Sequence, residues 1–132
     1  EELGDRAVLR GIHFYEEEDR VDAQVLALKE HRFLDFLKEV KASGDSSYKY
    51  LQNVYCNTDI KNQSVSIGLG LSDVILGTHG VSRVHGGGFA GTIQAFVENG
   101  FVKEYKTQME KVFGKGSCHV LKVRKYGGIK VL

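Results

Sequence analysis

The stretch Gly86-Gly87-Gly88-Phe89-Ala90-Gly91, here called the Gly-rich loop, contains the residue types that most directly suggest chemistry. Three successive residues without a β-carbon let backbone N–H groups face outward and let an anion or another chain approach closely. Arg83 lies just upstream and would add positive charge, and His85 adjoins the loop. The pattern predicts either an anion site or a hairpin without a ligand, and Gly-rich hairpins without a ligand are the commoner of the two.

The surrounding residues exclude two common phosphate-binding motifs. A Walker loop needs GxxxxGK[ST] before a helix, and that spacing does not occur here. A dinucleotide-binding loop also leads into a helix. The segment Thr92–Val97 alternates instead like a strand, with Ile93, Ala95 and Val97 on one face. An anion bound here would therefore be held by a different motif.

The other reactive side chains do not combine into a catalytic or metal site. Cys56 and Cys118 have no neighbouring base in the sequence, so we expect unreactive thiols. No metal-ligand spacing to a cysteine or carboxylate occurs among the histidines, which are His13, His31, His79, His85 and His119. The sequence predicts no catalytic residue and no metal ligand within this chain.

The first half of the chain is predicted to be helical. Apolar residues recur at helical spacing between positions 6 and 43, with a corner between two antiparallel helices at Lys29-Glu30-His31. Ser43–Ser47 is expected to be either a break or a weak point in a helix that resumes at Tyr48–Leu51.

A polar loop is expected over Asn53–Asn62, followed by a helix over Ile60–Ile75 that stops at Gly77. Gly68 and Gly70 lie inside that helix, and close packing against a neighbour would explain them.

The second half predicts strand, loop, strand, helix and strand. The strands are expected over Val81–His85, Thr92–Val97 and Ser117–Lys125, with a short extended piece over Ile129–Leu132. A helix over Phe101–Phe113 is expected to stop at Gly114 and to pack on the sheet. This element order predicts an α+β fold with helices packed over one face of an antiparallel sheet.

The length of the chain limits the number of domains, and its net charge limits the classes of binding partner. The chain of 132 residues fits one domain, and its formal net charge of +1 predicts no general attraction to nucleic acid or to an anionic membrane. No apolar run approaches the roughly 20 residues that span a bilayer. We therefore expect a reduced, cytoplasmic setting. Since Met109 is the only methionine, we also expect the chain to be processed or to be part of a longer protein.

Three stretches resemble galactokinases, which belong to the GHMP sugar and metabolite kinase superfamily. Residues 82–91 resemble the third family motif, typically ARMTGGGFGG. Arg10, His13, Glu17 and Arg20, followed by Ala27-Leu28, match the spacing of the family's RAxHxxxENxR…AL helix. A partial match is found at 43–46, where galactokinases have SHxS. Gly44 and His85 differ from the family pattern, so the identity of the sugar stays open.

The resemblance implies that this chain is the C-terminal part of an ATP-dependent sugar kinase. It implies an α+β, ferredoxin-like domain whose Gly-rich loop lies close to nucleotide and substrate, with Arg83, His85, Ser43 and Ser46 facing the cleft. ATP, Mg²⁺ and the catalytic residues would belong to an N-terminal kinase domain that is not part of this sequence, so we expect the chain alone to be inactive and to bind no cofactor.

Two alternatives stay open from the sequence. One is a stand-alone ferredoxin-like module with a ligand-binding or regulatory role, and the other is a kinase homologue without catalytic activity. If the kinase interpretation is right, the face with the Gly-rich loop meets the N-terminal domain or, in an isolated chain, a second copy. Phe89 is the apolar side chain expected to be exposed there.

Overall fold

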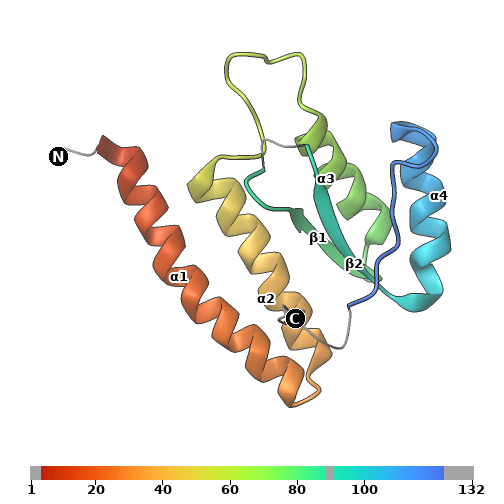
Figure 1. Cartoon of the computed structure of the whole chain (residues 1–132), viewed down its shortest axis with the longest axis horizontal. Coiled ribbons are helices and arrows are strands. Elements are labelled where there is room, and N and C mark those ends of the chain that lie inside the picture. The colour runs from red at the N-terminus through yellow and green to blue at the C-terminus, as the bar shows by residue number, and fades with distance from the viewer. Residues whose placement is uncertain (1–3, 89–90, 124–132) are drawn as a thin grey trace, which may run out of the picture.

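The fold is described from a computed structural model, which defines residues 4–88 and 91–123 (Figure 1). Its elements in chain order are α1 (Gly4–Lys29), α2 (Phe33–Ser46), the π-helical turn η1 (Ser47–Leu51), α3 (Ser64–Leu76), β1 (Gly80–Val84), β2 (Ile93–Val97), the 3₁₀ turn η2 (Asn99–Phe101) and α4 (Val102–Phe113). The chain is thus a mixture of helices and a two-stranded antiparallel sheet, which confirms the α+β class.

Helices α1 and α2 form an antiparallel pair joined by the corner that the sequence predicted. His31 adopts a left-handed conformation with φ of 57°, and the Arg32 N–H donates to the Ala27 carbonyl at 2.8 Å. Ala27, Phe36 and Val40 are buried together at the contact between the helices. The corner therefore turns α2 back along α1, where their apolar residues meet.

The α2 helix does not break at Ser43–Ser47, so the weak-point alternative is the one confirmed. It runs on to Ser46, widens into the π-helical turn η1 and ends at Gln52, which is left-handed with φ of 52°. A glycine inside a helix costs about 1 kcal/mol relative to alanine. At Gly44 that cost is offset by close packing, because a β-carbon there would lie 2.9 Å from the Arg83 Cβ of β1.

The α3 helix begins at Ser64, so the prediction that it starts at Ile60 is wrong. The Asp59 carboxylate accepts hydrogen bonds from the backbone N–H groups of Lys61 and Asn62, at 3.1 and 3.3 Å, and this turn replaces the first helical turn. Ile60 is 80% exposed, so no burial of its side chain stabilises a helix that would begin there. The predicted end at Gly77 is confirmed.

The two strands form a hairpin in which Ser82 pairs with Ala95 and Val84 with Ile93. Val81 and Phe96 pack against the buried cluster of α1 and α2. Ile93, Ala95 and Val97 pack instead against Leu76 of α3 and against Tyr105 and Met109 of α4, as predicted for the 101–113 helix.

Helices consequently cover both faces of the hairpin, with α2 on one side and α3 and α4 on the other (Figure 1). The expectation of helices over one face is therefore wrong for the described residues. The reason lies in the apolar residues of the hairpin: Val81 and Phe96 pack on one side, and Ile93, Ala95 and Val97 pack on the other.

The predicted strand over Ser117–Lys125 does not form within residues 117–123, while positions 124–125 and Ile129–Leu132 lie outside the described residues. Leu121 and Val123 are exposed, and no strand of the described hairpin pairs with this segment. Alternating apolar residues favour an extended conformation, but a strand also needs a partner edge. In the part of the chain that the structure defines, every helix is too short or too polar to cross a lipid bilayer.

Candidate functional site

The Gly-rich loop connects β1 to β2, and positive backbone angles explain three of its glycines. The φ values are 61° at Gly86, 87° at Gly88 and 80° at Gly91, a region that side chains with a β-carbon rarely adopt. The His85 N–H donates to the Thr92 carbonyl at 3.2 Å, and the Gly91 N–H donates to the Gly88 carbonyl at 3.1 Å. These two hydrogen bonds join the described residues on either side of Phe89 and Ala90, which lie outside the described residues.

One side of the loop packs against Asn53, which follows η1. A β-carbon on Gly88 would overlap the Asn53 carbonyl oxygen, and the Asn53 Nδ2 donates to the Gly87 carbonyl at 3.3 Å. Asn53 is buried, and its Oδ1 has no hydrogen-bond partner within the described residues. Nothing in the sequence indicated this contact, because Asn53 lies in a polar loop more than thirty positions before the glycines.

The other side of the loop is open. Gly86 and Gly87 are exposed, and a β-carbon on either would meet no atom within 4 Å. Among the described loop residues, Gly88 is thus packed by its own chain while Gly86 and Gly87 are exposed, which allows close approach of a ligand to the backbone.

A set of polar side chains joins α1, α2 and β1 just before this loop. We call it the polar network; its members are His13, Glu17, Arg20, Ser43, Ser46 and Arg83. Arg83 donates from Nη1 to Ser43 Oγ at 2.6 Å, and Ser43 in turn donates to the Glu17 carboxylate. Arg83 Nη1 also lies 3.7 Å from Glu17 Oε1.

The rest of the polar network lies on α1 and on the end of α2. His13 Nδ1 and Ser46 Oγ are 2.9 Å apart, and Arg20 donates to Glu17 at 2.8 Å. Ser46 is buried and hydrogen bonded to His13, so this pair fastens α1 to α2 and offers no accessible nucleophile.

The surroundings fix the charges within the polar network. Burial raises the pKa of Glu17, but hydrogen bonds from Ser43 and Arg20 and the charge of Arg83 outweigh it, so the pKa is lowered overall and Glu17 stays anionic. Burial lowers the pKa of His13, and the charges of Arg20 and Arg83 lower it further against the opposing effect of Glu17. His13 is therefore neutral near pH 7.

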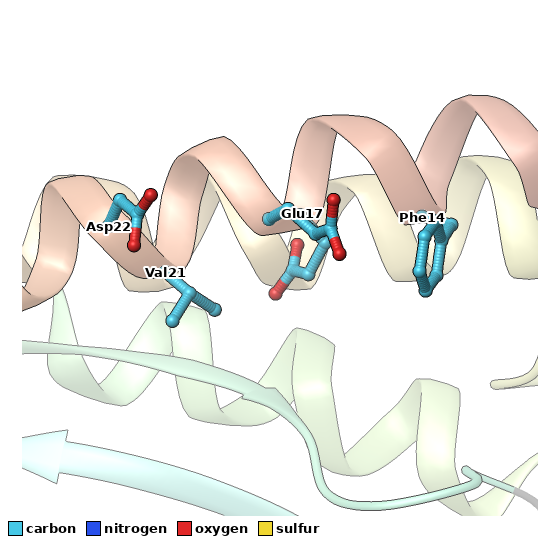
Figure 2. Close-up of a pocket in the computed structure, with 5 residues that line it drawn as sticks. Phe14, Glu17, Val21 and Asp22 are labelled. Atoms are coloured by element: carbon cyan, nitrogen blue, oxygen red, sulfur yellow. The ribbon is translucent and has the colours of Figure 1, made fainter.

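Two surface hollows lie beside the polar network. One, of about 410 Å³, follows the side of α1, where Figure 2 shows Phe14, Glu17 and Val21 along the helix; Glu18 and Asp22 complete its lining. The second, of about 230 Å³, lies between α2, α3 and β1 and includes Lys41, Asp73 and Arg83. Lys41 Nζ and Asp73 Oδ2 are 3.9 Å apart, so these two charges in the second hollow are paired with each other.

Of the residues that the sequence singled out, the structure brings Ser43, Ser46 and Arg83 together. The His85 side chain is exposed and makes no hydrogen bond to any other described residue, although it precedes the loop. The polar network also includes His13, Glu17 and Arg20, whose regular spacing in the sequence was noted only as part of the family resemblance. Arg10, from the same spacing, is exposed.

Gly86 and Gly87 are exposed, and the described residues offer no combination of an accessible nucleophile and a base. No group of three or more His, Cys, Asp or Glu side chains that could bind a metal ion occurs within residues 4–88 and 91–123. Comparison of the chain with protein-family models, with curated proteins and with solved structures finds no match.

Proposed function

We propose that this chain is the C-terminal part of an ATP-dependent sugar kinase resembling galactokinase, with the ferredoxin-like domain of GHMP kinases. The observation that supports the proposal is the meeting of three motif stretches in space. Glu17 from the first stretch, Ser43 from the second and Arg83 from the third form one chain of hydrogen bonds. Residues that match a family pattern separately are thereby joined directly before the Gly-rich loop.

In this proposal the Gly-rich loop contributes backbone contacts near the nucleotide and the substrate. Catalysis of phosphoryl transfer depends mainly on positioning and on neutralising phosphate charge. The accessible glycines Gly86 and Gly87 would supply N–H donors at close range. ATP, Mg²⁺ and the groups that act on the transferred phosphate would be held by the N-terminal kinase domain, and the acceptor would be a hydroxyl of galactose or a related sugar.

Substitution of Gly87 in the full-length enzyme tests this role. A β-carbon at Gly87 would meet no described atom within 4 Å, so we expect Gly87→Val to leave the packing of the described part of the loop intact. If a phosphate or substrate approaches the loop, the added side chain should lower kcat/KM for ATP or sugar on the order of tenfold or more, as misplacement of reacting groups does. Gly100→Val is the matched control, because Gly100 is also exposed and a β-carbon there would also meet no atom within 4 Å.

Steady-state kinetics with ATP and a panel of sugars, coupled to ADP release, provides the measurement. Unchanged kcat/KM values in Gly87→Val, equal to those of Gly100→Val, would remove the loop from the proposed site. If the wild-type full-length protein releases no ADP with any sugar, the protein is instead a kinase homologue without catalytic activity. A gene that encodes only these residues would favour the stand-alone module.

A further inference from the structure

Arg83 is held by contacts to α1, to α2 and to its own strand. Its Nη1 donates to Ser43 Oγ and lies near Glu17, while its Nε donates to the Val84 carbonyl at 3.1 Å. These contacts direct the guanidinium toward α1 and α2. Its positive charge lies 3.7 Å from the Glu17 carboxylate, so these contacts bear on the position of β1 directly before the loop.

We propose that Glu17 is a positioning residue for the Gly-rich loop: with Ser43 it holds Arg83, and through Arg83 it fixes the place at which Gly86 and Gly87 present their backbone. The consequence for phosphoryl transfer rests on the function proposed above. The consequence for the geometry of the loop does not.

The hydrogen bonds between these residues have one consistent direction. Arginine has donors only, an ionised glutamate has acceptors only, and a serine hydroxyl has one donor and can accept as well. Ser43 therefore accepts from Arg83 and donates to Glu17, and it is fully buried between them. A hydrogen bond to an ionised group is stronger than one between neutral groups, so the negative charge of Glu17 strengthens the contact that holds Arg83.

The loop is thereby held to the same helices at two places. Arg83 fixes the strand before the loop to Ser43 in α2, and Asn53, at the end of the continuous α2–η1 segment, contacts Gly87 and Gly88. Because Ser43 lies in α2 and Asn53 follows the continuous α2–η1 segment, both contacts tie the loop to the same part of the chain. Glu17 adds α1 to this unit, and its side chain also lines the hollow on α1 (Figure 2).

Glu17→Gln in the full-length protein tests the proposal, with Glu18→Gln as the matched control. Glu18 is the adjacent, exposed carboxylate and makes no hydrogen bond to the polar network in the described residues, so both variants remove one negative charge from α1. Hydrogen–deuterium exchange of the His85 and Gly91 amides reports on the loop, because the His85 N–H bonds to Thr92 across the base of the loop and the Gly91 N–H bonds to Gly88 within it. Steady-state kinetics gives KM for ATP and for the sugar separately.

Glu17→Gln should speed exchange of the two amides and raise KM for ATP by about tenfold each, the scale of losing one charge-assisted hydrogen bond, and Glu18→Gln should change neither. Exchange rates equal to those of Glu18→Gln would overturn the proposal. A lower kcat with unchanged KM for ATP would also overturn it, because that result indicates only a smaller folded fraction.

The experiment distinguishes this inference from the proposed function. A wild-type protein without kinase activity would refute the kinase proposal, while the exchange comparison would still decide whether Glu17 holds the loop. If circular dichroism shows that Glu17→Gln does not fold, Arg83→Lys tests the same link, because lysine keeps the charge but lacks the planar fork that contacts Ser43 and Val84 together. Unchanged amide exchange in Arg83→Lys would then overturn the proposal.

Discussion

Three helical glycines should respond to alanine with opposite signs. Gly44 lies in α2, while Gly68 and Gly70 lie in α3. A β-carbon on Gly44 would lie 2.9 Å from the Arg83 Cβ, 3.3 Å from its Cα and 3.4 Å from the Ser82 carbonyl oxygen. These atoms belong to β1 or are attached directly to it, so α2 and β1 would have to move apart. The contact explains why a small residue occupies this position.

The magnitudes follow from two opposing effects. Alanine is about 1 kcal/mol more favourable than glycine inside a helix. Overpacking costs about 1–3 kcal/mol, and rigid neighbours place Gly44→Ala near the upper end, for a net loss of about 2 kcal/mol. Gly70→Ala meets no atom within 4 Å and should gain about 1 kcal/mol. Gly68→Ala should gain somewhat more, because its methyl group makes ordinary contacts at 3.6 and 3.7 Å with Ile93 and Phe113.

Urea unfolding followed by circular dichroism measures the free energy of unfolding of the three variants. The midpoint should fall for Gly44→Ala and rise for Gly68→Ala and Gly70→Ala, with an unchanged m value. A midpoint for Gly44→Ala at or above that of the wild type would refute the close packing of α2 on β1. A loss of stability in Gly70→Ala would contradict the open space beside Gly70.

Further outcomes are expected from the buried polar groups and from the isolated chain. The pKa values of His13 and Glu17 are lower in the folded chain than in the unfolded chain, so the unfolded chain takes up protons at a higher pH. The melting temperature should therefore fall as the pH drops below about 6.5 and again below about 4.5. His13→Gln should abolish the first decrease, and a constant melting temperature between pH 7.5 and 5.5 in the wild type would contradict this. Tyr105→Phe leaves the fully buried Ser72 hydroxyl without its partner at 2.9 Å and should cost about 1–2 kcal/mol in urea unfolding, part of which Ser72→Ala should restore in the double variant. Gly88→Ala should destabilise the loop strongly, because its φ is positive and its β-carbon would overlap Asn53; a normal melting temperature would contradict that contact. The purified 132-residue chain should form no sugar phosphate from ATP in a coupled assay, and measurable turnover would contradict the division of roles proposed above.

Several helices and strands could be predicted from the sequence because the residue patterns that indicate them are local. Helical spacing predicted α1, α2 and α4, and the Lys29-Glu30-His31 corner was placed correctly. Alternation predicted β2, and the strand expected over Val81–His85 corresponds to β1. Glycine marked the ends of α3 and α4, since a left-handed or otherwise unusual backbone angle at these positions is accessible to glycine at little cost. Each of these features depends on neighbours within one or two turns of the chain.

The errors occurred where the outcome depends on partners far away in the sequence. The Ser117–Val123 segment alternates like a strand, yet the described hairpin gives it no partner. Ile60 fits a helical pattern, but the Asp59 turn takes the backbone elsewhere. Gly70 was expected to pack closely and instead faces open space, because the position of a neighbouring element cannot be inferred from helix periodicity.

The sequence by itself determined that a Gly-rich hairpin follows an arginine-containing strand and that α1 and α2 contain regularly spaced polar residues. Only the tertiary structure decided that these features meet. Ser43 and Glu17 are 26 positions apart and Ser43 and Arg83 are 40 apart, yet they form one chain of hydrogen bonds. The physical reason is that the apolar faces of α1, α2 and β1 bury one another around Ala27, Phe36 and Val40, and this packing fixes which polar side chains lie opposite each other.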